Sequence, residues 1–138
     1  MNIEWIGDYN NVLNYLIATS VKFKFKLNIG CPKNYRPPKF VMDWVKKNKR
    51  KINVFNDPKK AAKNADVIFS DKVVSLNDKV NKVKKIKDFK NYRISSSLVK
   101  YAKNNVIFLH CLPRGNEVSA DVFLGTKSRV WQQALNRV

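Results

Sequence analysis

Three polar segments that follow apolar runs carry side chains able to bind or activate a ligand. Asn10-Asn11 comes after the run that ends at Gly7, Asp71 and Ser75 follow "ADVIFS", and His110-Cys111 ends "NNVIFLHC". Amide groups both donate and accept hydrogen bonds, which suits the zwitterionic end of an amino acid. A carboxylate suits an ammonium group, so Asp71 is the natural partner for an amine. From its position alone, Asp71 could equally be a cap or a solvated loop residue.

The neighbouring His110 and Cys111 resemble a catalytic pair only at first sight. Adjacent residues of a strand point to opposite faces of a sheet, so the two side chains are not expected to bond to each other. One His and two Cys also supply a zinc site poorly. We interpret His110 as structural and Cys31, the other cysteine, as a small buried hydrophobic residue.

The elements that must position these residues alternate between strand and helix patterns. Strands are predicted at residues 3–6, in the later half of 22–30, at 52–55, 65–71 and 104–111, with a possible sixth at 128–134. Helices are predicted at residues 10–21, around 39–48, after an N-cap at Asp57, at the surface around 80–86, and from the serines at 95–97 to about 103.

This alternation predicts an α/β fold, specifically a Rossmann-like, doubly wound and mostly parallel sheet with helices on both faces. In such sheets, ligands bind beyond the carboxyl ends of the strands, where the strand order reverses. The three polar segments follow the first, fourth and fifth predicted strands, so they are expected to meet at one edge.

A nucleotide does not fit the turn after the first strand. A dinucleotide fingerprint requires G-x-G-x-x-G, but only Gly7 is present, and no G-x-x-x-x-G-K-[ST] occurs elsewhere. Amides stand where further glycines would be needed for backbone to approach a phosphate.

The net charge of +18 raises the alternative of a basic nucleic-acid-binding protein. The chain has 22 Lys but only 6 Arg, together with 17 Asn, and the lysines are scattered along its length. Lys and Asn share A/T-rich codons, and specific readers of nucleic acid favour Arg. We therefore attribute the charge to composition, and expect neither a nucleic-acid partner nor a membrane partner.

The length of 138 residues and the 44% hydrophobic content fit one globular domain with a real core. No apolar run approaches the roughly 20 residues that span a bilayer. The N-terminus lacks the pattern of a signal peptide. Two distant cysteines do not form a disulfide framework, so a cytoplasmic location is expected.

Four segments resemble motifs of the ornithine carbamoyltransferase family. "WIGDYNNV", "DKVVSLND", "FLHCLPRGNEV" and "VWQQALNRV" resemble W-I-G-D-x-N-N, D-x-W-x-S-M, H-C-L-P followed by E-E-V, and E-N-R, in the same order and spacing. "NIGCPKNYRP" also resembles the family stretch ending in T-P-K-G-Y. The resemblance covers residues 3–138, which correspond to the ornithine-binding half of these enzymes.

The resemblance implies which residues hold ornithine. Asn11 matches the residue that holds the amino-acid end. Asp71, Ser75 and Leu76 fall on the loop that closes over ornithine. Cys111 matches the cysteine that contacts ornithine and distinguishes these enzymes from relatives that use aspartate. Whether ornithine, acetylornithine or putrescine is the acceptor stays open, although Cys111 favours ornithine.

The resemblance also implies contacts with carbamoyl phosphate. The Leu112 carbonyl, set by a Leu-Pro bond that is cis in the family, matches the acceptor for the carbamoyl amide. Arg137 matches the arginine that reaches the carbonyl oxygen. Asp71, Cys111 and Arg137 are thus the expected catalytic residues of a reaction that gives citrulline and phosphate in arginine biosynthesis and that requires no metal or organic cofactor.

The chain departs from the family pattern in ways that define alternatives. Val73, Leu76, Asn77, Asn116 and Leu135 replace a Trp, Met, Gly, Glu and Glu of the motifs. The S-x-R-T and H-P-x-Q segments of the carbamoyl-phosphate domain do not occur in it. We therefore expect residues 1–138 to be the second domain of a two-domain enzyme, which the family assembles as a homotrimer, and to be inactive alone. A free-standing or degenerate amino-acid-binding module is the alternative.

Overall fold

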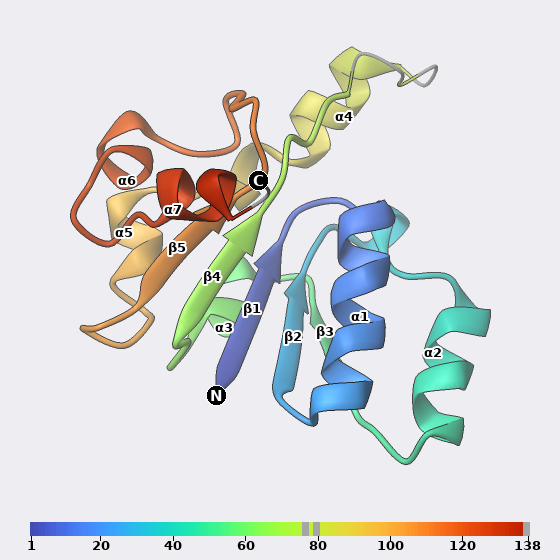
Figure 1. Ribbon diagram of the computed structural model, residues 1–138. Helices are drawn as coiled ribbons and strands as arrows, with labels where there is room; N and C mark the ends of the chain where they lie inside the picture. Colours follow the sequence, from blue (N-terminus) through green and yellow to red (C-terminus); the bar gives the residue numbers. More distant parts are fainter. Residues whose placement is uncertain (76–77, 79–80, 137–138) are drawn as a thin grey trace.

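The computed structural model describes residues 1–75, 78 and 81–136, and Figure 1 shows a single twisted sheet with helices on both faces. The five strands are β1 (Asn2–Ile6), β2 (Lys26–Gly30), β3 (Asn53–Phe55), β4 (Val67–Ser70) and β5 (Ile107–His110). Every pairing between them is parallel, in the order β3-β2-β1-β4-β5. This order is that of a Rossmann-like doubly wound sheet and confirms the predicted fold class.

Two hydrophobic cores sandwich the sheet. The first face packs against α1 (Asn11–Phe23) and α2 (Lys39–Lys47), and its core includes Trp5, Leu13 and Val45. The opposite face packs against several short helices, and its core includes Ile68 and Phe108. The α-helices that contribute buried residues to this second core are α3 (Pro58–Ala62), α5 (Ser96–Val99), α6 (Ala120–Phe123) and α7 (Val130–Leu135).

Between β4 and α5 the chain rises above the sheet. Helix α4 (Lys82–Asp88) projects from the body of the domain, as Figure 1 shows in yellow. The turns η1 (Lys33–Tyr35) and η2 (Lys90–Tyr92) complete the described elements. The side chains of Tyr35 and Phe89 pack edge to face with ring centroids 4.8 Å apart, which anchors the end of α4.

Local sequence signals placed most elements well. Helix α1 is capped by Asn10, whose side chain accepts a hydrogen bond from the Leu13 amide at 3.0 Å. The predicted cap at Asp57 is confirmed by its bond from the Lys59 amide at 2.9 Å. Helix α5 is shorter than predicted, because it ends at Val99 rather than near residue 103.

The prediction of a sixth strand at residues 128–134 is wrong. Ser128 makes only an isolated bridge to Phe108, and the chain then turns into helix α7. The alternation in "SRVWQQA" was too short to decide between the two structures. Burial of Val130 against the second core favours the helix.

The predicted surface helix near residues 80–86 exists as α4, but its apolar side chains face solvent and one of its lysines is buried. Val83 and Ile86 are 77% and 60% exposed, whereas Lys85 is only 5% exposed. Val80 lies outside the described residues. No helix in the described part of the chain is long and apolar enough to cross a membrane.

Candidate substrate-binding site

The carboxyl ends of β1, β4 and β5 lie at one edge of the sheet, as expected for parallel strands (Figure 1). The strand order reverses between β1 and β4, so the switch point of the fold lies there. Segments far apart in the sequence therefore meet at this edge. The turn after β1, the loop after β4 and the turn after β5 supply the polar groups of the candidate site.

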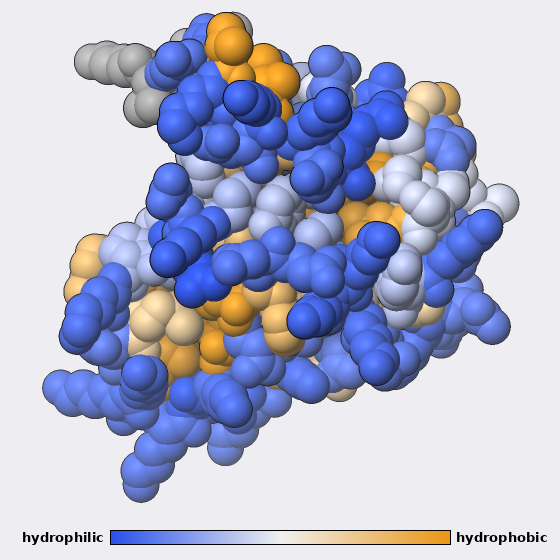
Figure 2. Space-filling view, turned by 180° about the vertical axis from the view of Figure 1, so that it is seen from behind, coloured by the Kyte–Doolittle hydropathy of each residue, from blue (hydrophilic) through white to orange (hydrophobic). Residues whose placement is uncertain are grey.

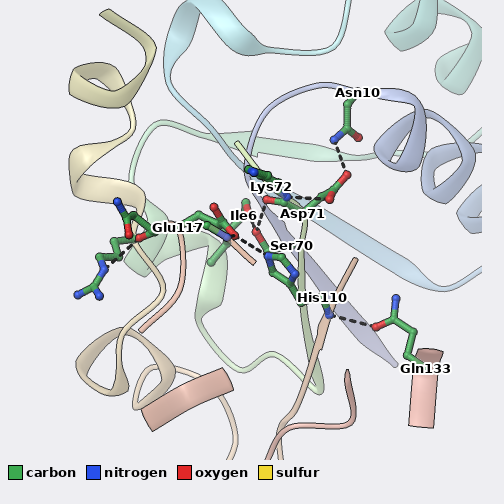
Figure 3. A network of polar contacts seen from close by, with 11 residues as sticks. Ile6, Asn10, Ser70, Asp71, Lys72, His110, Glu117 and Gln133 are labelled. Carbon is green, nitrogen blue, oxygen red and sulfur yellow. Dashed lines mark hydrogen bonds and ion pairs between the residues drawn. The ribbon is translucent and has the colours of Figure 1, made fainter. Parts of the chain in front are cut away.

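Asn10 and Asp71 form the central contact between two of these segments (Figure 3). The Asn10 amide Nδ2 donates to Asp71 Oδ2 at 3.0 Å, while Asn10 Oδ1 caps helix α1. The Lys72 backbone amide donates to Asp71 Oδ1 at 2.7 Å. Because each carboxylate oxygen has further acceptor capacity, Asp71 can still bind an ammonium group from solvent or ligand.

Ser70, the last residue of β4, holds the ends of three strands in register. Its buried hydroxyl donates to the Ile6 carbonyl at 2.6 Å, and its own carbonyl accepts from the Cys111 amide at 3.2 Å. The ends of β1, β4 and β5 are thereby held together by one residue. This contact brings Asp71, the next residue, between the other two segments.

The loop after β4 carries Ser75, which lies exposed at its far end. The Ser75 amide donates to Asp78 Oδ2 at 2.8 Å, a short turn that closes the loop on itself. Leu76, the other loop residue predicted to contact a substrate, lies outside the described residues.

Cys111 and Leu112 follow β5 and face different surroundings. Cys111 is buried, and its sulfur accepts from Gln133 Nε2 of helix α7 at 3.8 Å. Gln133 Oε1 also accepts from the His110 amide at 3.0 Å, so one amide holds both residues (Figure 3). Leu112 is 41% exposed, and the peptide bond from Leu112 to Pro113 is cis, as expected.

The imidazole of His110 turns away from Cys111 and supports the turn after β5. Its Nε2 lies 2.8 Å from Glu117 Oε1, which also accepts from the Gly115 amide at 2.7 Å. Burial alone would raise the pKa of Glu117, but these hydrogen bonds hold the pKa below its usual range. The buried ring also packs on Phe123. A structural role for His110 agrees with this geometry.

A buried ion pair joins α4 to the turn after β1. Lys85 Nζ lies 2.6 Å from Asp8 Oδ2 and 2.9 Å from Asp78 Oδ2. Burial alone would lower the pKa of Lys85, but the bonds to both carboxylates raise it overall. The lysine is therefore charged at neutral pH, and it lies between two of the three segments of the site.

A cavity of about 790 Å³ lies beside the Ser75 loop, beneath α4. Figure 2 shows the projecting α4 lobe, with apolar surface exposed on it, above a hollow in the body of the domain. Apolar side chains such as Val73 and Phe89 line the interior. The basic residues among its lining are Lys72, Lys82, Lys87, Lys90 and Arg93.

The geometry unites some of the predicted residues and leaves others apart. Asp71 and Cys111 lie on adjacent strand ends, but the amide that contacts Asp71 belongs to Asn10, whereas Asn11 is exposed at the first turn of α1. Arg137 lies outside the described residues. Among the described residues, no group of three or more His, Cys, Asp or Glu side chains could hold a metal ion.

Sequence reasoning missed several residues that organise the site. Ser70 carried a usable signal, because a small polar residue at the end of a buried strand must find a partner. Gln133 and Lys85 carried no such signal. Gln133 lies in a short segment that could be a strand or a helix, and Lys85 lies in a run of lysines. Only the packing of α4 and α7 on the sheet edge assigns them.

Known proteins resemble the chain over its whole length. The family described as "Aspartate/ornithine carbamoyltransferase, Asp/Orn binding domain" matches residues 1–138. An ornithine carbamoyltransferase of Methanocorpusculum labreanum is 37% identical over all of this chain and 46% of its own length. A mitochondrial ornithine carbamoyltransferase of Aquarana catesbeiana is 41% identical over 99% of this chain and 41% of its own.

Solved structures show the same relation. The anabolic ornithine carbamoyltransferase of Campylobacter jejuni superimposes with a TM-score of 0.89 at 32% identity, over 98% of this chain and 46% of that one. The enzyme from Pyrococcus furiosus gives a TM-score of 0.88 at 34% identity, over 99% and 46%. The chain thus spans about half the length of the relatives it matches. With this fold, these motifs and a match from end to end, it belongs to the aspartate/ornithine carbamoyltransferase family and corresponds to its Asp/Orn-binding domain.

Proposed function

We propose that this chain is the amino-acid-binding half of an ornithine carbamoyltransferase, which converts carbamoyl phosphate and L-ornithine to citrulline and phosphate in arginine biosynthesis. The observation that carries the proposal is the meeting of Asp71 and Cys111 at the switch-point edge, within a chain whose curated relatives are named ornithine carbamoyltransferase. Those relatives are about twice as long.

In this proposal, the turn after β1 and the loop after β4 hold the amino acid. Asn11, exposed at the start of α1, binds the α-amino and carboxylate end, and Ser75 and Leu76 cover the bound molecule. Asn10 supports this arrangement from behind, because its bond to Asp71 fixes the carboxylate relative to α1. Amides and a carboxylate at neighbouring positions match the donors and acceptors of an amino acid.

The reaction requires a free amine at the side-chain end of ornithine. An alkylamine of this kind has a pKa near 10.4, so it arrives protonated and must lose a proton before it attacks the carbonyl carbon. Asp71 and Cys111 orient the ammonium group, and the Asp71 carboxylate accepts its proton. The nitrogen lone pair then forms the new C–N bond, and phosphate leaves with the electrons of the broken C–O bond.

The carbamoyl group is held by two further residues in this proposal. The Leu112 carbonyl, exposed after β5, accepts from the carbamoyl amide, and Arg137 stabilises the negative charge that develops on the carbonyl oxygen. Groups that bind the phosphate would come from a second domain and, in a homotrimer, from a neighbouring subunit. The 138-residue chain alone is therefore expected to form no citrulline.

Titration of the chain with L-ornithine, followed by calorimetry and by NMR, tests the binding part of this proposal. We expect binding by the wild type and a loss of about tenfold or more in affinity for Asp71→Asn, because the amine loses its charged partner. Asp43→Asn, which removes an exposed carboxylate on α2, is the matched control and should bind as the wild type does. Acetylornithine and putrescine, titrated in parallel, identify the acceptor.

Two outcomes would contradict the proposal. Citrulline formation by the isolated chain would overturn the claim that it is half of the catalytic apparatus. A dissociation constant for ornithine above about 10 mM would leave a degenerate module that retains only the fold. Tight ornithine binding by a chain that gains no activity with any carbamoyl-phosphate domain would favour a free-standing amino-acid-binding module.

A further inference from the structure

Lys85 is the one buried lysine among the described residues. Lysine is rarely buried, because removing an ammonium group from water costs several kcal/mol unless it is paired. Lys85 meets this requirement with two carboxylates, Asp8 at 2.6 Å and Asp78 at 2.9 Å. Its neighbours Lys82, Lys84 and Lys87 show that the helix has ample lysines, so composition alone does not account for this geometry.

The two carboxylates belong to different segments of the candidate site. Asp8 lies in the turn after β1, two residues before Asn10, and its backbone carbonyl is held by Trp5 Nε1 at 3.1 Å. Asp78 lies in the loop after β4, where the same Oδ2 atom accepts from Lys85 and from the Ser75 amide. A continuous polar chain therefore runs from the rigid turn through Lys85 to the backbone of Ser75.

Helix α4 does not need Lys85 for its attachment to the domain. Its far end is tethered separately, because the Tyr35 hydroxyl donates to Asp88 Oδ2 at 2.9 Å and the Phe89 ring is buried against Tyr35. Lys84 makes an exposed ion pair with the same Asp88. What Lys85 adds beyond these tethers is the link between Asp8 and the Ser75 loop.

We propose that Lys85 is a positioning residue that fixes the Ser75 loop relative to the turn after β1, and so sets the distance between the two halves of the amino-acid site. The inference rests on the proposed function, because it assigns Ser75 and Asn11 to one ligand. Lys85 does not touch that ligand. It acts through Asp78 on the backbone of the loop and through Asp8 on the turn.

Two variants of the 138-residue chain test this role against a matched control. Lys85→Met keeps the alkyl stem and removes the charge, Lys85→Arg keeps a charge, and Lys84→Met removes an exposed charge one residue away. Hydrogen exchange of the Ser75 and Ile68 amides, measured by NMR, separates the loop from the sheet core. The dissociation constant for L-ornithine is measured on the same samples.

We expect Lys85→Met to speed exchange at Ser75 by about tenfold more than at Ile68, because the loop loses its support in addition to the general loss of stability that Ile68 reports. Ornithine binding should weaken by about tenfold as well, since the loop must then be ordered by the ligand. Lys85→Arg should keep most of the slow Ser75 exchange and most of the ornithine affinity. Lys84→Met should resemble the wild type in both measurements. If Lys85→Met does not fold, Asp8→Ala breaks the same link at its turn end and leaves the bond between the Ser75 amide and Asp78 in place.

Unchanged Ser75 exchange in Lys85→Met would overturn the proposal, and so would equal acceleration at Ser75 and Ile68, which indicates a general loss of stability. The exchange measurement needs no ligand. If the wild type fails to bind ornithine, the proposed function fails, while selective exchange at Ser75 still decides whether Lys85 holds the loop. If Lys85→Met speeds exchange at Ser75 but leaves ornithine binding unchanged, Lys85 does not position the amino-acid site.

Discussion

Helix α1 begins at the carboxyl edge of the sheet and runs along its face, whereas α4 projects above that edge (Figure 1), and the two helices bury opposite kinds of residue. Helix α1 packs Leu13 and Ile17 fully against the first core. Helix α4 exposes Val83 and Ile86 and buries Lys85. Hydrophobic burial fixes the first helix. The second is tethered at its far end by the contacts of Tyr35 with Asp88 and Phe89, and its Lys85 ion pair links it to the turn after β1.

This difference has a physical reason in what each helix covers. The surface beneath α1 is the apolar face of β1 and β2, so an apolar stripe removes the most surface from water. Helix α4 instead projects above the carboxyl ends of the strands (Figure 1), where Lys85 meets the carboxylates of Asp8 and Asp78.

Truncation of the buried apolar side chains should give the largest contrast. Leu13→Ala is expected to lower the free energy of unfolding by about 3 kcal/mol, because it removes a fully buried side chain and leaves a cavity. Val83→Ala on α4 should change it by less than about 0.5 kcal/mol. Urea denaturation measures both, and comparable losses would mean that α4 also packs through its apolar side chains.

A second buried ionisable group, which has no charged partner among the described residues, tests whether pairing is what separates the regions. Glu4 of β1 is fully buried, and Asn28 Nδ2 donates to its Oε1 at 2.6 Å. Burial raises the pKa of Glu4 to about 8 from 4.5, so the folded chain holds a proton that the unfolded chain releases in this range. Stability from this group is therefore present at low pH and falls as the pH rises from about 4.5 to 8.

The matched variant for this prediction is Glu4→Gln, which resembles the neutral acid at every pH. Relative to the wild type, the variant should gain about 4 kcal/mol of unfolding free energy between about pH 5 and about pH 8.5. Urea unfolding of both proteins over this range is the measurement. A constant difference between them would show that Glu4 does not titrate on unfolding.

Removal of the α4 charge should have a moderate effect on global stability. Lys85→Met is expected to lower the unfolding free energy by about 1–2 kcal/mol, because Asp8 loses its partner while water still reaches part of it. Lys84→Met should cost less, since its ion pair is exposed. If the two variants were equal in urea denaturation, burial would not be what distinguishes Lys85.

The helix caps offer the smallest contrast. Both helices begin after an Asn whose side chain accepts a backbone amide, Asn10 from Leu13 at 3.0 Å and Asn81 from Lys84 at 3.2 Å. Asn10→Ala is expected to lower the free energy of unfolding by about 1 kcal/mol, and Asn81→Ala by about half as much. The difference arises because Asn10→Ala also removes the hydrogen bond to Asp71. Thermal unfolding midpoints of the two variants show which substitution costs more stability. A larger loss in Asn81→Ala would contradict this prediction.

Sequence reasoning succeeded where the signal is local. Alternating strands and helices predicted the parallel sheet, and polar residues after strand ends predicted the edge where Asp71 and Cys111 meet. The contact between Asn10 and Asp71 was not predicted, because it depends on how the turn after β1 packs against the end of β4. The roles toward substrates stay predictions for all the residues proposed to contact them, namely Asn11, Asp71, Ser75, Leu76, Cys111, Leu112 and Arg137.

The sequence by itself determined the fold class, the family and the segments that form the site, because periodicity, turn residues and motif spacing are properties of neighbouring positions. The tertiary structure alone decided which lysine is buried, which glutamine holds Cys111 and which side of α4 faces inward. These depend on contacts between segments that lie tens of residues apart. A run of chemically identical lysines contains no local signal that distinguishes Lys85 from its neighbours.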